Sequence, residues 1–342
     1  MAATGPEVSW RGLIAAELFM PNPRLHLVAT GGTIAGAGTR PQASMEYRAG
    51  VLDAAALHAS VPGLDEVAEF TLEQFASIDS KDATPAFWQA LAARLQEVLD
   101  DPAVDGVIVT HGTDTLEETA YYLHLVLQTT KPVVLVGAMR PATSLSADGP
   151  MNLLDAAAVA ACLGASGRGV MVVMNHRIFG ARGVAKINAS RPDAFASPDA
   201  GPLGLVQDGR IVWLARPERL HTSATRFTAG TPLLPVEILA GYAGISADLI
   251  RAAGACGAQG LVWAGPGSGS AGATALAALA ELQAAGVVVV CTTRTGSGCA
   301  PAVHGMVGGG TLSPWKARVL AMLALGSGCR EPAALQSLFD TH

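Results

Sequence analysis

Short runs of apolar, often β-branched residues alternate along the chain with longer amphipathic stretches. Four of these runs contain few charges and lie at residues 25–30, 106–110, 132–137 and 169–174. Such runs are typical of strands buried on both faces of a parallel sheet. Between them, apolar residues recur at three- and four-residue intervals after Thr84 and Pro85, which predicts a capped helix. A further strand near residues 75–78 and a helix over 152–163 complete this part.

After Met174 the pattern loosens into a proline-punctuated, irregular stretch, and residues 216–232 are typical of a linker. The alternation then resumes. We expect strands at 236–239, 260–264 and 286–291, and helices at 246–253, 271–285, 314–325 and 331–339. The pattern therefore predicts an α/β protein. A larger Rossmann-like N-terminal domain with a mostly parallel sheet covers 24–215, a smaller C-terminal α/β domain covers 233–342, and residues 1–23 form an N-terminal extension.

Composition narrows the class of protein. The 342 residues suit two domains, and 50% hydrophobic with only 15% charged residues excludes a disordered chain. So small a fraction of charged residues favours a homo-oligomer, in which part of the surface of each subunit is buried, although a large monomeric core explains the small fraction almost as well. A net charge of −6 without a long basic stripe argues against nucleic acid as a partner.

Membrane and export signals are not expected. No apolar run approaches about 18 residues, the length needed for a membrane-spanning helix. Residues 1–23 contain Glu7 and Glu17, with no basic start and no long apolar core, so we expect no signal peptide. The five cysteines are odd in number and form no C-x-x-C pair, which argues against a disulfide framework or a zinc site. Together these features predict a cytoplasmic protein.

Polar side chains follow several of the predicted strands. Thr33 follows the first strand, Ser80 and Lys81 the second, and Thr113 and Asp114 the third. Ligands of open parallel sheets bind at the carboxyl ends of the strands, so these residues form a candidate site. Turns of this kind are often polar for structural reasons alone.

The turn before the helix that begins near residue 115 is the most specific of these signals. Thr115 and Glu118 match a capping box, and the free backbone N–H groups of a helix start could hold a carboxylate or an oxyanion. A simple strand–turn–helix junction explains the same pattern.

A threonine nucleophile at this edge would need a base or a proton relay. Lys186 stands alone in a stretch of small and apolar residues, and Tyr47 lies in a glycine-flanked segment after Thr33. Either side chain could accept a proton, and either could equally be structural.

These residues lie within longer motifs. ATGGTIAG at 29–36, GVIVTHGTDTLEETAYY at 106–122, GAMRP at 137–141 and SADGP at 146–150 resemble the signatures of bacterial-type L-asparaginases, the type II branch more closely than type I. The resemblance extends from about residue 25 to the C-terminus and thins after residue 294. It implies an amidohydrolase that converts L-asparagine to aspartate and ammonia, with glutaminase side activity possible in the family.

The resemblance implies a role for each matching residue. Thr33 matches the nucleophile that forms an acyl-enzyme, and Tyr47 matches the tyrosine that takes or relays its proton. Thr113, Asp114 and Lys186 match a second catalytic group, in which the lysine tunes the proton of the threonine.

Other matches concern substrate binding and assembly. Ser80 and Asp114 match residues that hold the α-carboxylate and α-amino group of the substrate, and Ser270 matches a residue that the neighbouring subunit contributes. The family forms dimers that pair into tetramers and needs no metal or cofactor. Two departures stand out. Lys81 replaces a glutamine or glutamate, and no acidic residue follows Arg294 before Glu331, where the family has a glutamate.

Two other functions remain open at this point. Gly267, Gly269 and Gly272 form a literal G-x-G-x-x-G between a predicted strand and a predicted helix, as in NAD(P)-dependent oxidoreductases. The acidic residue that this fingerprint expects about 20 positions later is missing. The alternative is a non-catalytic accessory module, for example one that feeds ammonia to a partner. Such relatives carry an extra N-terminal domain, for which 23 residues are too few.

Overall fold

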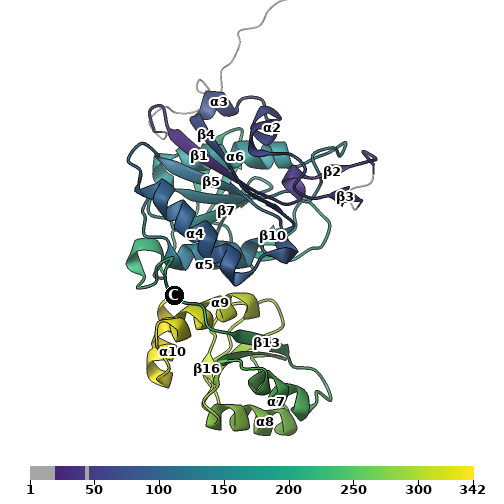
Figure 1. Ribbon diagram of the computed structural model, residues 1–342, viewed down its shortest axis with the longest axis vertical. Helices are drawn as coiled ribbons and strands as arrows, with labels where there is room; N and C mark the ends of the chain where they lie inside the picture. The colour runs from purple at the N-terminus through teal and green to yellow at the C-terminus, as the bar shows by residue number, and fades with distance from the viewer. Residues whose placement is uncertain (1–19, 43–45) are drawn as a thin grey trace, which may run out of the picture. The chain divides into compact units, whose positions relative to one another are not determined.

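The computed structural model describes residues 20–42 and 46–342 and divides into two compact units (Figure 1). Unit 1 is Met1–Ser197 with Gly201–Glu218, and unit 2 is Pro198–Ala200 with Arg219–His342. The change from one unit to the other after Glu218 falls inside the segment 216–232 that the sequence suggests as a linker. Most of the expected N-terminal extension, residues 1–19, lies outside the described residues.

Unit 1 is built on an eight-stranded sheet in the order β12-β11-β8-β7-β6-β5-β1-β4. Five parallel strands come first: β1 (Arg24–Gly31), β4 (Glu69–Ile78), β5 (Gly106–Thr110), β6 (Val133–Val136) and β7 (Val170–Met174). The three antiparallel strands are β8 (Arg177–Gly180), β11 (Gly204–Gln207) and β12 (Arg210–Trp213). The predicted mostly parallel sheet is confirmed.

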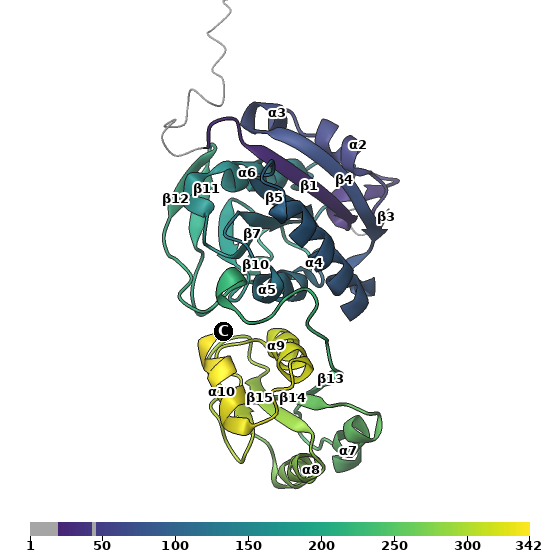
Figure 2. The ribbon, with the colours of Figure 1, turned by 60° about the vertical axis from the view of Figure 1, so that its left-hand side comes forward.

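Helices cover both faces of this sheet (Figure 2). One face packs against α2 (Ala54–Ala59), α3 (Leu64–Val67) and α6 (Gly149–Ala161), and the other against α4 (Pro85–Asp100) and α5 (Leu116–Val126). The parallel strands β5, β6 and β7 are buried along their whole length, which explains their uninterrupted apolar sequences. Thr84 caps α4 as predicted, since its hydroxyl accepts a hydrogen bond from the Phe87 N–H at 3.2 Å.

The stretch after Met174 is more regular than its sequence predicts. In addition to β8, β11 and β12 it contains the two-residue strands β9 (Ala185–Lys186) and β10 (Phe195–Ala196). The prediction of irregular structure is therefore wrong where these five short strands lie. Strands β11 and β12 form a hairpin through Asp208 and Gly209, both at positive φ, a turn chemistry that favours hairpins.

Unit 2 is a smaller α/β unit with the parallel sheet order β13-β14-β15-β16. Its strands are β13 (Val236–Ala240), β14 (Gly260–Gly265), β15 (Val288–Thr293) and β16 (Val307–Gly308), and its helices are α7 (Ala247–Ala255), α8 (Ala273–Ala284), α9 (Pro314–Gly326) and α10 (Pro332–Thr341). The predicted smaller C-terminal α/β domain is confirmed, and each predicted element is present within about two residues of its expected bounds.

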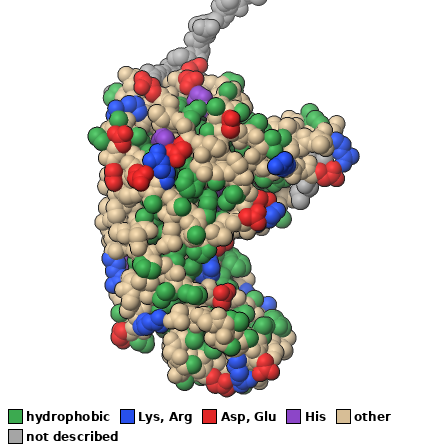
Figure 3. Space-filling model, viewed as in Figure 1, with side chains coloured by type: hydrophobic (Ala, Val, Ile, Leu, Met, Phe, Trp, Pro, Cys, Tyr) green, Lys and Arg blue, Asp and Glu red, His purple; other side chains and the backbone are tan. Residues whose placement is uncertain are grey.

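The surface of the described residues carries few charges. On the face shown in Figure 3, acidic and basic side chains lie in small groups of mixed sign between larger neutral areas. All five cysteines are free thiols. Among the helices of the described part of the chain, none is long and apolar enough to cross a membrane.

Candidate active site

The carboxyl ends of β1, β4 and β5 meet in one place, where their turns pack backbone against backbone. Gly32 has a φ of +78°, and a Cβ there would lie 2.4 Å from the Cα of Gly112. A Cβ on Gly112 would in turn lie 2.6 Å from the Ser80 hydroxyl. Only glycine permits these approaches. The three turns therefore interlock, and the side chains that flank the two glycines are held close together.

The first pair of side chains is Thr33 and Tyr47. Thr33 begins a short 3-10 turn, Thr33–Ala35, directly after Gly32, and is buried. Tyr47 lies on β3 (Tyr47–Arg48), which pairs with β2 (Ala37–Gly38). The two hydroxyl oxygens are 2.6 Å apart, and the tyrosine ring lies against Gly36, where a Cβ would be 2.8 Å from Cδ2. The phenol oxygen can thus exchange a proton directly with the threonine hydroxyl.

The second group is Thr113, Asp114 and Lys186. The Lys186 ammonium donates to the Thr113 hydroxyl at 2.9 Å and to the Asp114 carboxylate at 2.6 Å. Strand β9 brings the lysine to this point, and its side chain is only 16% exposed. A cation beside a hydroxyl favours the ionised form of that hydroxyl, and the carboxylate compensates part of the lysine charge.

Ser80 and Lys81 follow β4 in a short 3-10 turn, Ser80–Asp82. The Ser80 hydroxyl is buried and accepts a hydrogen bond from the Asp114 N–H at 3.2 Å. This N–H group is therefore already used, and an oxyanion would need other donors of the turn. Lys81 points to solvent, 65% exposed, and its Nζ lies 2.9 Å from the Asp79 carboxylate. That hydrogen bond raises the pKa of Lys81.

The predicted capping box at Thr115 is wrong. Thr115 is the N-cap residue of α5, but its side chain makes no cap hydrogen bond. Its hydroxyl donates instead to the Ser80 carbonyl at 2.7 Å, which ties the turn after β4 to the turn after β5. The local sequence does match a capping box, but the Thr115 hydroxyl donates to the carbonyl of a residue 35 positions away in the chain and not to its own helix.

His111 belongs to a buried chain of hydrogen bonds that the sequence did not reveal. Trp88 Nε1 donates to the Thr119 hydroxyl at 2.9 Å, and that hydroxyl lies 3.1 Å from His111 Nε2. His111 Nδ1 donates to the Gly112 carbonyl at 2.7 Å. Burial lowers the pKa of His111 to about 4, so the ring is neutral and its one N–H fixes the turn that carries Thr113.

Glu117 was also missed. It lies on the first turn of α5 with only 7% of its surface exposed, and its Oε1 is 3.4 Å from the backbone nitrogen of Lys186. The available signal in the sequence was its place, three residues after Asp114 at the start of the predicted helix. A carboxylate there adds negative charge beside the lysine.

Ser270 lies in unit 2, in the turn between β14 and α8, and its carbonyl accepts a hydrogen bond from Trp263 Nε1 at 3.1 Å. The glycines of this turn have a packing explanation. A Cβ on Gly269 would lie 2.2 Å from the Cys291 sulfur, whereas one on Gly272 would meet nothing within 4 Å. In a dinucleotide fingerprint the last glycine serves close helix–strand packing, so Gly272 does not fit that role.

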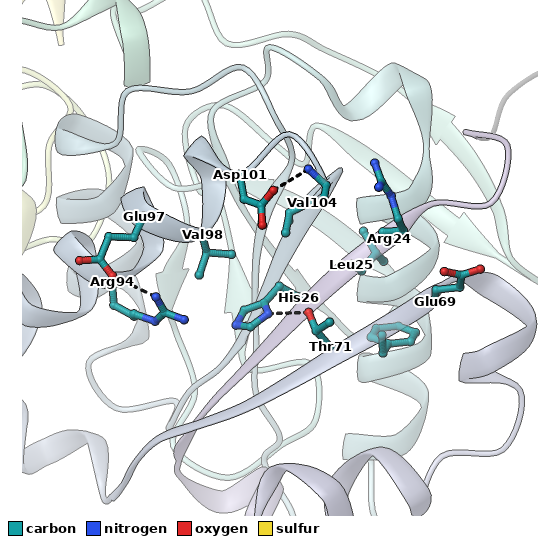
Figure 4. A pocket seen from close by; sticks show the side chains of 12 residues that line it. Arg24, Leu25, His26, Glu69, Thr71, Arg94, Glu97, Val98, Asp101 and Val104 are labelled. Carbon is teal, nitrogen blue, oxygen red and sulfur yellow. Dashed lines mark hydrogen bonds and ion pairs between the residues drawn. The ribbon is translucent and has the colours of Figure 1, made fainter.

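A separate cavity of about 450 Å³ lies at the amino ends of β1 and β4 (Figure 4). His26 and Thr71 form its floor and are hydrogen-bonded at 2.6 Å, while Arg94 faces His26 from α4. Arg94 is bound to Glu73 and Glu97 at 2.9–3.0 Å. Its positive charge is satisfied within the protein, and the cavity is at the opposite end of the strands from Thr33. In the described part of the chain, no group of three or more His, Cys, Asp or Glu residues is placed to hold a metal ion.

Family models match most of the chain. The model described as Asparaginase, N-terminal, matches residues 24–219, and the model described as Glutaminase/Asparaginase C-terminal domain matches residues 235–339.

Individual relatives are similar over nearly their whole lengths. L-asparaginase 2 of Bacillus subtilis is 40% identical over 94% of this chain and 87% of its own, and L-asparaginase 2 of Escherichia coli is 39% identical over 97% and 96%. A glutaminase-asparaginase of Pseudomonas fluorescens is 39% identical over 92% and 89%. A crystal structure of a probable cytoplasmic L-asparaginase from Campylobacter jejuni matches with a TM-score of 0.91 and 39% identity, over 94% of this chain and all of that one.

Proposed function

Because the chain belongs to the glutaminase/asparaginase family, we propose that it hydrolyses the side-chain amide of L-asparagine to give L-aspartate and ammonia. The observation that carries the proposal is the 2.6 Å contact between the Thr33 and Tyr47 hydroxyls, which pairs a buried nucleophile with a proton acceptor. The oxidoreductase interpretation is not supported, since asparaginases match along both units and Gly272 lacks the packing role of the fingerprint.

In the proposed first step, Thr33 Oγ1 attacks the amide carbon and its proton passes to the Tyr47 oxygen, while the Tyr47 phenol gives its own proton to the amide nitrogen. The tetrahedral intermediate collapses as the C–N bond breaks. The leaving nitrogen, with this added proton, departs as ammonia, which leaves an ester between Thr33 and the aspartyl group. Water then attacks this ester and one of its protons passes to the Thr33 oxygen as the C–O bond breaks, which restores the threonine hydroxyl and releases aspartate.

Thr113 and Lys186 support one of the two attacks. The Lys186 ammonium donates to the Thr113 oxygen at 2.9 Å and so leaves the Thr113 hydroxyl proton free to hydrogen-bond the reacting atoms and hold the attacking group in place. Backbone N–H groups of the turn at Thr113 serve as oxyanion donors. The Asp114 N–H is not one of them, because it already donates to the Ser80 hydroxyl.

Ser80 and Asp114 hold the amino-acid end of the substrate. The Asp114 carboxylate is 58% exposed beside Lys186, and it can bind the α-ammonium group. The Ser80 hydroxyl can donate its proton to the α-carboxylate while it accepts the Asp114 N–H. Lys81 adds a positive charge near the carboxylate, moderated by Asp79.

We further propose that the protein acts without a metal or cofactor, as a homodimer or homotetramer in the cytoplasm, and that Ser270 of a neighbouring copy completes each site. Membership of a family whose members form dimers that pair into tetramers supports this assembly. The similarity to a Campylobacter jejuni protein described as cytoplasmic supports the location, whereas a Haemophilus influenzae relative is described as periplasmic.

The test is ammonia release from L-asparagine by the purified protein, with L-glutamine and D-asparagine in parallel. We expect release from L-asparagine, and a loss of at least about 10³-fold in kcat for Thr33→Ala. Thr129→Ala is the matched control, because that hydroxyl accepts the Lys131 N–H at 3.0 Å, away from the site. Equal activity in Thr33→Ala and the wild type would overturn Thr33 as the nucleophile, and no release from any of the three amides would overturn the activity itself.

A further inference from the structure

The strand that carries Tyr47 belongs to a hairpin too small to be stable alone. Strands β2 and β3 have two residues each, and an isolated two-stranded hairpin is marginal even when it is longer. Yet the proposed chemistry needs the Tyr47 oxygen to stay within hydrogen-bond reach of Thr33. Contacts from elsewhere in the chain must therefore fix this hairpin.

One side of β2 meets the loop of residues 139–146, which follows β6. The Ala142 N–H donates to the Gly36 carbonyl at 2.9 Å. The Thr143 hydroxyl accepts the Gly38 N–H at 2.8 Å and lies 3.4 Å from the Gly38 carbonyl. The hydroxyl thus occupies the place of a neighbouring strand along the open edge of β2.

Gly38 is also the residue that pairs with Tyr47 across the hairpin. The line of contacts from the loop to the nucleophile is therefore short: Thr143 binds Gly38, Gly38 pairs with Tyr47, and Tyr47 touches Thr33. Gly36, held by the same loop, lies under the tyrosine ring.

The loop itself is anchored firmly enough to serve as a support. The Asp148 carboxylate accepts the backbone N–H groups of Met139 and Arg140, each at 2.9 Å, and lies 3.2 Å from the amide nitrogen of the buried Asn152. Asn152 in turn donates to the Gly137 carbonyl at 3.1 Å. The start of the loop is therefore tied to α6 and to the end of β6.

We propose that Thr143 is a positioning residue for Tyr47, whose hydroxyl sets the place of the hairpin and so the distance between the Tyr47 and Thr33 oxygens. This inference rests on the proposed function of those two residues. Arg40 and Glu46 also form an ion pair in the hairpin, but both side chains are about two-thirds exposed, and such pairs contribute little.

The experiment compares Thr143→Val, which keeps the shape and removes the hydroxyl, with Thr143→Ser, which keeps the hydroxyl. Loss of one hydrogen bond of this kind predicts a fall in kcat of roughly three- to tenfold for the valine variant, with KM and the melting temperature nearly unchanged. The serine variant should be close to wild type. Ser146→Ala is the matched control, since that hydroxyl binds Arg140 within the same loop and not the hairpin.

A double-mutant cycle with Tyr47→Phe tests whether Thr143 acts through the tyrosine. If it does, Thr143→Val should cause no further loss of kcat once the phenol oxygen is gone. An equal loss in both backgrounds, or wild-type kcat in Thr143→Val, would overturn the positioning role. Full activity in Tyr47→Phe alone would instead overturn the proposed function of Tyr47, so the two failures are distinguishable.

Discussion

Replacement of His111 by asparagine should make the folded protein less sensitive to acid. In the wild type the imidazole is fully buried and neutral, and its pKa is lowered from 6.5 to about 4 by burial. Asparagine can still donate to the Gly112 carbonyl and cannot take up a proton. The variant therefore removes the titration and keeps one hydrogen bond, at the cost of the contact with Thr119.

The sign of the effect follows from where protons bind. Below pH 6.5 the unfolded chain protonates this imidazole and the folded chain does not, so acid favours unfolding. The unfolding free energy falls by about 1.4 kcal/mol for each pH unit until the folded pKa near 4 is reached. Across the whole interval the wild type should lose about 3 kcal/mol that the variant does not lose.

The assay is urea unfolding at a fixed protein concentration, from about pH 7 to about pH 4.5. At neutral pH the unfolding free energy of the variant should be about 1–2 kcal/mol below that of the wild type, because of the lost hydrogen bond, and near pH 4.5 it should match or exceed that of the wild type. His304→Asn is the matched control, since that histidine is exposed and asparagine tolerates its φ of +51°. Parallel curves for His111→Asn and wild type would refute the burial of a neutral ring.

Two further changes test other features. Lys81→Gln should raise KM for L-asparagine by roughly two- to fivefold and leave kcat and the melting temperature nearly unchanged. The effect on KM is small because the Lys81 cation is exposed and partly compensated by Asp79. An unchanged KM in steady-state assays would exclude Lys81 from substrate binding. Gly269→Ala should destabilise the protein in thermal unfolding by about 2 kcal/mol or more, because Gly269 has a φ of +90° and a Cβ there would lie 2.2 Å from the Cys291 sulfur. Gly272→Ala should be tolerated. Equal losses of stability in the two variants would contradict the packing explanation of this turn.

The sequence predicted best what depends on long buried segments. The strands at 106–110 and 170–174 are uninterrupted apolar runs because helices cover both of their faces, and that burial is visible in the sequence. The hairpin of β11 and β12 alternates buried and exposed residues over only four positions per strand, so its signal was weak. The turn residues Asp208 and Gly209 were the available clue.

The candidate site was predicted as residue types at strand ends, and its connections were not. The short pattern at Thr115 and Glu118 resembles a capping box whatever lies opposite, so it could not show that the Ser80 carbonyl takes the Thr115 hydroxyl. Lys186 comes from a two-residue strand without periodicity; its isolation among small and apolar residues made it a candidate, and its match to the family gave it a role. Hydrogen bonds between residues far apart in the chain leave little trace in local patterns.

The interlocked glycines also determine where substrate selectivity can be redesigned. Any side chain at Gly32 or Gly112 would force the turns after β1, β4 and β5 apart, so libraries that vary these positions would consist mostly of inactive proteins. Diversity is better placed on the rim, at the exposed Lys81, where replacements alter the surroundings of the substrate and leave the interlocked backbone intact.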